Sequence, residues 1–163
     1  PPLPEDAPEF PAPNLNDPNT RLEQEVLAVI LQAPDALTED GVLLICQQMF
    51  ATPAYVVIAD AASQSISSLK LPDWFAQIVS KTPEVLHTLL RQLAAKELPI
   101  RDAEQLNEYA LSVVNSARKK IMMRQKSALV AALGSLDVEA QPDEHNRIQQ
   151  ALVVLEGQIR AIE

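Results

Sequence analysis

The chain has 163 residues, of which 22 are acidic, 13 are Lys or Arg and three are glycine. Its net charge of -9 excludes a general nucleic-acid binder, because affinity for phosphates requires a cationic surface. The low aromatic content and the scarcity of glycine favour an all-α fold, since sheets draw on aromatic side chains and on turns that contain glycine. The length allows one domain, or one domain with an appendage.

The cysteine content and the N-terminal sequence indicate the compartment. Cys46 is the single cysteine, so the chain forms neither an internal disulfide nor a thiolate metal site, and a reducing compartment is expected. The N-terminus is acidic and Pro-rich, unlike a signal peptide, and no apolar run is long enough to span a membrane. We therefore expect a cytoplasmic protein without membrane contact. Because the chain begins with Pro1, we also expect it to be part of a larger protein.

The first segments of the chain are a linker and a helix. Residues 1–16 contain six prolines among acidic residues, which predicts an extended or disordered linker. Asp17 is then a suitable N-cap, and Pro18 stands at the first helical position, where its missing N–H does no harm. The apolar residues that follow are too many for a surface helix. They predict a central helix that ends at Pro34.

Short helices separated by prolines are expected next. Thr38 is a suitable cap before a short, buried helix over residues 42–50. Thr52-Pro53 begins another helix, and residues 63–68 form a polar loop after it.

Two further helices complete the predicted bundle. Residues 71–79 predict a short helix. Thr82 is expected to cap the next helix, with Pro83 at its first position and a broad apolar face behind it. Leu98-Pro99 ends that helix.

The last third of the chain predicts an antiparallel helical hairpin. Asp102 caps a long helix, with a bend expected around residues 115–116, and Gly134 ends it. A final helix follows from Pro142 to the end of the chain. Its apolar residues recur at spacings of four and three, which is the seam that a helix uses to lie along another helix. The seam consists of Ile148, Leu152, Leu155, Ile159 and Ile162.

A glycine interrupts this final helix. Gly157 lies inside it, where glycine costs about 1 kcal/mol relative to alanine. Three interpretations stay open: it lets another backbone approach closely, it lets the tip of the helix bend on binding, or it is a tolerated defect.

No constellation of residues predicts a catalytic centre, a metal site or a cofactor. The glycines are isolated, so there is no Gly-rich phosphate loop. His87 and His145 have no metal-ligating partner at a suitable spacing, and both are interpreted as structural. Cys46 is expected to be a small core residue, and Trp74 a core anchor.

One stretch of the long helix is basic within an acidic chain. Two interpretations stay open: a solvated helix face, or a contact surface for an acidic partner or for passing nucleic acid. The stretch contains Arg118, Lys119, Lys120, Arg124 and Lys126.

The order of these signals resembles a known family. An acidic, Pro-rich linker precedes Arg21-Leu-Glu-Gln-Glu-Val-Leu-Ala-Val-Ile-Leu-Gln-Ala-Pro34, and Phe50-Ala-Thr-Pro53-Ala-Tyr55-Val-Val-Ile follows. The Leu98-Pro99 break, the segment Tyr109-Ala-Leu-Ser-Val-Val with Arg118, and the closing Gln149-Gln-Ala-Leu-Val-Val-Leu-Glu156 come later. From Arg21 to its end the chain resembles the C-terminal, helicase-binding domain of bacterial DNA primase (DnaG-type), and most closely the versions from high-GC Gram-positive bacteria.

The resemblance implies an organisation and a function. It implies a helical bundle over residues 17–114, followed by a helicase-docking hairpin over residues 115–163. In the family, the hairpin is the main anchor on the N-terminal collar of the hexameric replicative helicase, and the domain has no catalytic activity or cofactor. The parent protein would be a nucleotidyltransferase, a DNA-directed RNA polymerase that makes primers in the primosome. We expect the isolated domain to be monomeric and to act in the replisome at the nucleoid.

Candidate contact residues follow from the hairpin. The partner-binding candidates are Ile148, Leu152, Leu155, Ile159, Arg160 and Ile162 in the final helix, with Met123 and Arg124 in the long helix. Candidates for a basic contact are Arg118, Lys119, Lys120 and Lys126.

Alternatives to this interpretation stay open. Some members of the family bind the acidic tail of single-stranded-DNA-binding protein through basic residues near the first helix. Here that region reads Glu23-Gln24-Glu25, with Arg21 as its cation, which argues against this partner. The N-terminal domain of the replicative helicase has a similar helical fold, so that domain, or a generic helical adaptor, is the alternative identity.

Overall fold

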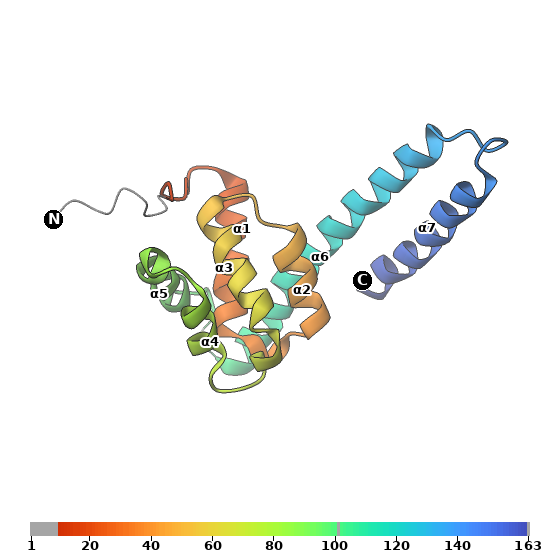
Figure 1. The fold of residues 1–163 in the computed structure, drawn as a ribbon. Helices are drawn as coiled ribbons and strands as arrows, with labels where there is room; N and C mark the ends of the chain where they lie inside the picture. The colour runs from red at the N-terminus through yellow and green to blue at the C-terminus, as the bar shows by residue number, and fades with distance from the viewer. Residues whose placement is uncertain (1–9, 101, 163) are drawn as a thin grey trace. The chain divides into compact units, whose positions relative to one another are not determined.

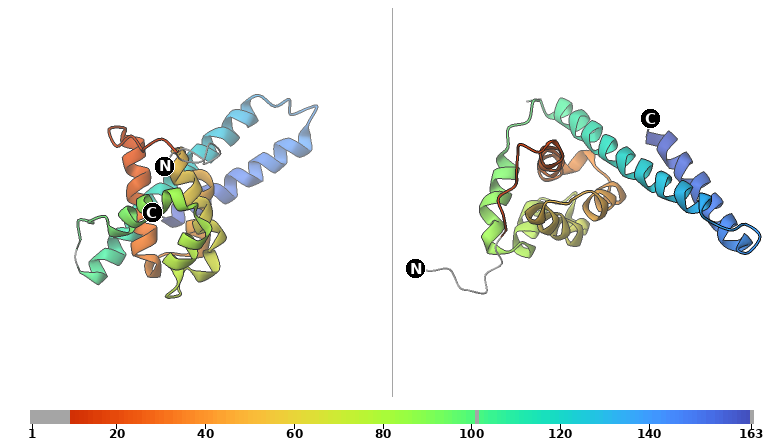
Figure 2. Two further views of the ribbon diagram at one scale, coloured as in Figure 1. Left: turned by 60° about the vertical axis from the view of Figure 1, so that its left-hand side comes forward. Right: turned by 90° about the horizontal axis from the view of Figure 1, so that it is seen from above.

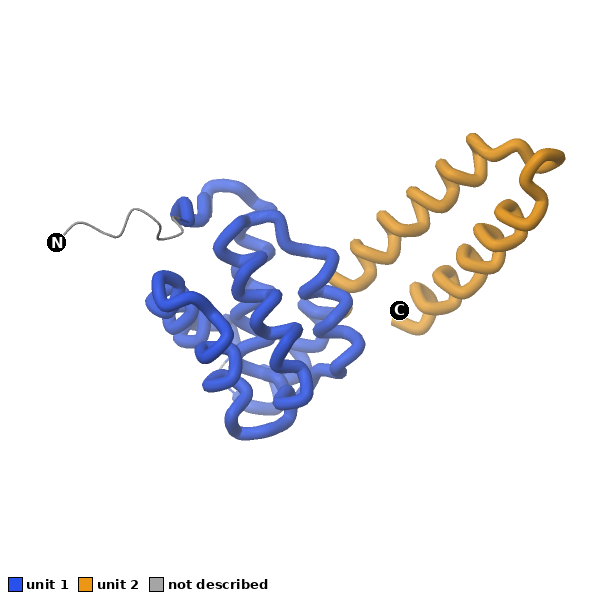
Figure 3. The backbone as a smooth tube through the Cα atoms, in the orientation of Figure 1, with its two compact units in different colours: residues 1–114 blue, residues 115–163 orange. Residues whose placement is uncertain are grey.

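The computed structural model describes residues 10–100 and 102–162. Within these ranges the regular structure is helical and contains no strand, which confirms the predicted all-α fold. The chain divides into two compact units, residues 1–114 and residues 115–163 (Figure 3). The predicted linker over residues 1–16 lies largely outside the described ranges. Its last residues form a turn, in which the Asp17 amide donates to the Asn14 carbonyl at 3.1 Å.

The first unit is a bundle of short helices (Figure 1). It ends within α6 (Ala103–Gly134), which runs on into the second unit without a break at residues 115–116. The elements before α6 are, in order, α1 (Pro18–Gln32), the 3-10 turn η1 (Pro34–Ala36), α2 (Glu39–Gln48), α3 (Pro53–Gln64), the 3-10 turn η2 (Ile66–Ser68), α4 (Trp74–Lys81), the 3-10 turn η3 (Glu84–Leu86) and α5 (His87–Ala95).

Helix α1 forms the centre of the bundle. The Asp17 side chain caps it by accepting from the Asn19 amide at 2.8 Å, and Pro18 occupies the first turn, both as predicted. Residues 26–30 are all fully buried, so the helix is covered on every side and not along one stripe. It packs against α3 and α5, and α3 packs in turn against α2 and α4. In the right-hand view of Figure 2, α1 is seen end-on with α5 and α3 beside it.

Polar side chains join α1 to its neighbours at helix ends. The indole Nε1 of Trp74 donates to the Ile30 carbonyl at 3.1 Å, so the buried Trp74 is the core anchor that the sequence predicted. Gln32 Nε2 donates to the carbonyls of Leu93 at 3.0 Å and of Lys96 at 2.9 Å. The carbonyls in the last turn of a helix receive no hydrogen bond from an N–H of the same helix. Trp74 therefore satisfies the Ile30 carbonyl, and Gln32 adds a second donor to the Leu93 carbonyl, which also accepts from the Lys96 amide at 3.4 Å.

A buried carboxylate holds the start of α3. Glu23 of α1 is only 5% exposed. It accepts from the amides of Ala51 at 2.5 Å and Thr52 at 3.1 Å, and from the Thr52 hydroxyl at 2.6 Å. These are the groups just before the first residue of α3, where a negative charge also suits the helix dipole. The burial of Glu23 was not predicted from the sequence.

The start of α5 differs from the prediction. Thr82 was expected to cap the next helix, but its hydroxyl donates backwards to the Ile78 carbonyl at 2.7 Å. Thr82 therefore closes the end of α4, as threonine can do by bonding to the carbonyl four residues before it. The chain continues with η3, and α5 begins only at His87.

Other helix boundaries shift by a few residues. Thr38 does cap α2, accepting from the Gly41 amide at 3.1 Å, but the helix begins at Glu39 and not at residue 42. Residues 63–68 are not a simple loop, because α3 extends through Gln64 before η2 begins. The start of α2 was predicted too late because its first turn is polar, and the apolar pattern begins only at Val42.

The first part of α6 is tied to the bundle by a three-residue polar cluster. Asp102 caps α6, as predicted, by accepting from the Glu104 amide at 2.8 Å. The Tyr109 hydroxyl donates to the Glu25 carboxylate of α1, and Lys96 Nζ lies 3.0 Å from the same carboxylate. Burial and this hydrogen bond raise the pKa of Tyr109 to about 12.

The second unit is an antiparallel hairpin, which confirms the predicted arrangement of the last third. It consists of the remainder of α6 and of α7 (Pro142–Ile162), joined by residues 135–141. The two helices run side by side in Figure 1. Lys126 Nζ of α6 lies 3.5 Å from the Glu156 carboxylate of α7, which marks the register between the two helices.

We predict that Glu23→Gln lowers the free energy of unfolding by about 2 kcal/mol. The amide oxygen can still accept from the two backbone amides, and the NH2 group can donate to the Thr52 hydroxyl, but the negative charge that strengthens these hydrogen bonds and suits the helix dipole is lost. Urea unfolding followed by circular dichroism measures the change. Glu108→Gln, at an exposed position of α6, is the control and should have no measurable effect. Equal stability of the two variants would contradict a structural role for the Glu23 carboxylate.

We predict that stability declines in alkaline solution. Burial raises the pKa of Tyr55, with a smaller contribution from Glu23, and the pKa of Tyr109 rises from 10.0 to about 12. A phenol with a raised pKa stabilises the fold below its unfolded pKa, and this contribution is lost as the pH rises from 10 through the folded pKa. Spectrophotometric titration should show tyrosinate forming well above pH 10 in the folded chain, and near pH 10 in urea. Ionisation near pH 10 in both states would refute the prediction.

Candidate functional site

His87 and Cys46 are both half-buried within the first unit. The Nε2 of His87 lies 2.9 Å from the Thr82 carbonyl. Burial raises the pKa of the Cys46 thiol to about 12, so it carries its proton at neutral pH and is a poor nucleophile. Within residues 10–100 and 102–162, no three His, Cys, Asp or Glu side chains are grouped as a metal ion would require.

Among the described residues, no helix combines the length and the apolar character needed to cross a bilayer.

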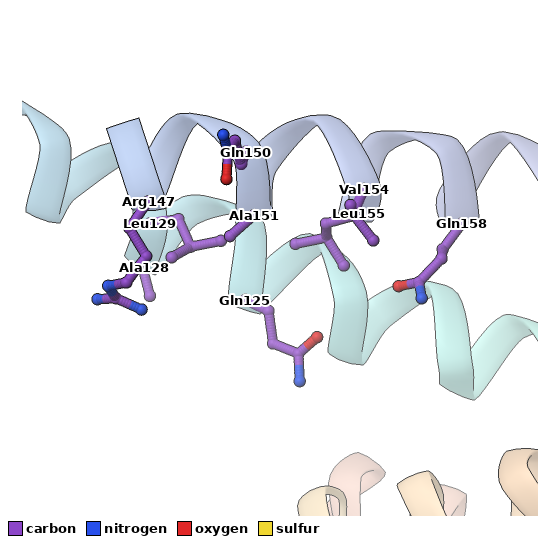
Figure 4. A pocket seen from close by; sticks show the side chains of 9 residues that line it. All are labelled: Gln125, Ala128, Leu129, Arg147, Gln150, Ala151, Val154, Leu155 and Gln158. Carbon is purple, nitrogen blue, oxygen red and sulfur yellow. The ribbon is translucent and has the colours of Figure 1, made fainter. Parts of the chain in front are cut away.

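The apolar seam predicted for docking forms the inside of the hairpin. Ile148, Leu155 and Ile159 are 3%, 7% and 8% exposed, and Leu152 and Ile162 are half-buried. Figure 4 shows Leu155 of α7 and Leu129 of α6 between the two helices. As the hairpin stands, these side chains hold α7 in place and offer little surface to a partner.

The other predicted contact residues are more accessible. Arg160 is exposed in the last turns of α7. In α6, Met123 is 44% exposed and Arg124 is exposed as well. These three side chains remain candidates for direct contact.

The basic stretch of α6 does not form one exposed patch. Lys120 is exposed, whereas Arg118 and Lys119 are half-buried. Arg118 Nη1 donates to the Asn115 side chain at 3.3 Å, and Lys126 forms the ion pair with Glu156 that joins the two helices of the hairpin. The side chains of Arg118 and Lys126 therefore make contacts within the chain itself.

The outer face of α7 was not among the predicted contact surfaces. Val153 and Val154 are 67% and 61% exposed, which makes them the most exposed of the large apolar residues in the described ranges. The signal was present in the sequence: an inward seam through residues 148, 152, 155 and 159 leaves 153 and 154 pointing away from it. The outer face of α7 comprises Asn146, Gln149, Gln150, Val153, Val154, Gly157 and Arg160.

Two hollows flank this face. A shallow groove of about 730 Å³ lies between α6 and α7, and Figure 4 shows its lining side chains. Gln125, Ala128 and Leu129 of α6 line it opposite Arg147, Gln150, Ala151, Val154, Leu155 and Gln158 of α7. The second hollow is lined by Asn146, Gln149, Gln150, Val153 and Val154. Val154 borders both hollows, so it forms the apolar ridge between them.

Arg147, which lines the groove, forms an ion pair within α7. Arg147 donates two hydrogen bonds to the Glu144 carboxylate one turn earlier, and this interaction lowers the pKa of Glu144. The charge of Arg147 is thereby compensated within α7. Arg160 is exposed and has no ion pair with any described residue, so it can meet an acidic group from outside.

Comparison with known proteins identifies a fold. No protein-family model and no curated protein sequence matches the chain. The structure is similar to a solved structure, the helicase binding domain of primase from Mycobacterium tuberculosis. The TM-score is 0.66, the sequences are 21% identical, and the match covers 87% of this chain and 89% of the other. The chain therefore has the fold of that domain, which confirms the predicted resemblance at the level of the fold.

We predict that the two faces of α7 differ in their contribution to stability. Ile148→Ala should lower the free energy of unfolding by about 2–4 kcal/mol, because it leaves a cavity in the hairpin. Val153→Ala should change it by no more than about 0.5 kcal/mol, as is usual at an exposed position. Urea unfolding of both variants gives the comparison. A larger loss for Val153→Ala would show that the inner and outer faces are wrongly assigned.

Proposed function

We propose that this chain is the helicase-binding domain of a bacterial replicative primase. Its hairpin would dock on the N-terminal collar of the hexameric replicative helicase. The observation that carries the proposal is the exposed apolar face of α7 on a hairpin whose fold matches the helicase binding domain of the mycobacterial primase. An exposed pair of valines next to grooves is the kind of surface that a partner helix covers.

The function is tethering and not catalysis. The domain would form the non-catalytic end of a primer-synthesising polymerase, and it needs no metal or cofactor for docking. Binding converts the search of the primase for the replication fork into a local one, and so raises its effective concentration there. The domain would be monomeric when isolated, and it would act in the cytoplasm as part of the replisome at the nucleoid.

The candidate residues then divide into two roles. The seam through Ile148, Leu155 and Ile159 holds the hairpin together, and so presents the outer face. Arg160, Met123 and Arg124 supply direct contacts at the rim. Lys120 and its basic neighbours add a salt-sensitive contribution to the encounter with an acidic surface. The tail of single-stranded-DNA-binding protein is left out of the proposal, because α1 carries one cation, Arg21.

Calorimetric titration of the chain with the N-terminal region of the helicase tests the proposal. We predict that Leu155→Asp abolishes binding and the stimulation of priming, because a carboxylate buried between α6 and α7 opens the hairpin. The bundle should stay folded, so circular dichroism should show only a partial loss of helix. Leu71→Asp is the matched control: Leu71 is a leucine of the first unit that is 54% exposed, and its replacement should leave binding unchanged.

Three outcomes would overturn the proposal or a part of it. If the unchanged chain does not bind the N-terminal region of the helicase, the proposed function is wrong. Self-association of the chain into rings, seen by sedimentation, would instead favour the alternative that it is the N-terminal domain of a helicase. Retained binding by Leu155→Asp with an opened hairpin would exclude the hairpin as the anchor.

A further inference from the structure

Gly157 has no structural reason to be glycine. It lies inside α7, and no glycine among the described residues has a positive φ. A Cβ atom built at Gly157 would meet nothing within 4 Å, so no neighbour in the chain requires the missing side chain. Glycine inside a helix lowers its stability relative to alanine, because the backbone loses more freedom on folding. Any advantage of a glycine at this position therefore comes from outside the chain.

The position of Gly157 suggests where that advantage arises. It follows Val153 by four residues and Val154 by three, so it lies one turn further along the outer face of α7. Arg160 follows by another three residues on the same face. Along this line the surface passes from the exposed Val153 and Val154 to the half-buried backbone of Gly157, and then to the exposed Arg160. A second helix can approach α7 most closely where the side chain is missing.

We propose that a helix of the helicase N-terminal region crosses the outer face of α7 with its backbone against Gly157. This inference rests on the proposed function and specifies the contact. Apolar side chains of the crossing helix cover Val153 and Val154 and enter the two hollows beside Val154. A carboxylate of the same helix pairs with Arg160. The occupant is thus an amphipathic helix with a small or apolar residue at the crossing and an acidic residue about one turn away.

The charges of α7 support an occupant with an acidic side chain. From residue 146 to residue 162 the single carboxylate is Glu156, and it is already paired with Lys126. Arg160 is therefore the charge that α7 directs to a partner across its outer face. Amide side chains border the valines on the outer face, so hydrogen-bonding groups surround an apolar centre, as in protein–protein interfaces. A membrane surface would require a basic helix face, and the outer face offers one arginine.

The test compares two glycines in the intact chain. Gly134, the last residue of α6, also has open space where a Cβ would stand, so Gly134→Ala is the matched control for Gly157→Ala. We expect Gly157→Ala to keep or raise the melting temperature by a few degrees. Its affinity for the helicase N-terminal region should nevertheless fall at least about tenfold, and Gly157→Leu should bind more weakly still. Gly134→Ala should bind like the unchanged chain.

A charge reversal tests the second contact. Arg160→Glu should weaken binding about tenfold at low salt, with a smaller loss at high salt. Arg91→Glu, at an exposed arginine of α5, is the control and should leave the affinity unchanged.

The outcomes separate the inference from the proposed function. If the unchanged chain binds and Gly157→Ala binds equally well, the crossing at Gly157 is wrong while the helicase-binding role stands. If the unchanged chain does not bind, both fail. If sedimentation shows a dimer of the chain that Gly157→Ala dissociates, the outer face is occupied by a second copy and the proposed occupant is wrong.

Discussion

The fold depends on the complete burial of the second half of α1, where residues 26–30 have no exposed surface. A helix that is covered on all sides needs neighbours around its whole circumference, and the short helices of the first unit provide them. Their ends then lie near the core, where carbonyls and amides without partners are costly. Glu23 and Gln32 of α1, together with Trp74 of α4, meet this requirement with side-chain hydrogen bonds. The same helix therefore supplies both the apolar centre and the polar connections.

The hairpin follows a different principle. It has two helices and a narrow core, so each helix buries one stripe and leaves the rest of its surface outside. On α7 the buried stripe includes Ile148 and Leu155, and the opposite side presents Val153 and Val154. Apolar surface that the chain leaves exposed on a helix is available to a partner. The inner seam thus holds the hairpin together, and the outer face stays accessible.

Much of the fold could be predicted from local signals. Asp17, Thr38 and Asp102 cap helices as expected, since a side-chain oxygen before a helix acts within a few residues. The hairpin followed from the spacing of apolar residues in the last third. Thr82 was misplaced because its hydroxyl can bond forwards or backwards along the chain, and the choice depends on the ends of both helices.

By itself, the sequence determined the helical class, most helix starts and the existence of a hairpin, because capping, proline positions and periodicity act over one or two turns. Tertiary structure alone decided that Glu23 is buried against the start of α3, since residues that are distant in the sequence make that contact. It also decided which apolar residues of α7 are buried and which are exposed. The seam predicted for docking lies inside the hairpin, and Val153 and Val154 lie outside, because α6 covers one side of α7 and leaves the other open.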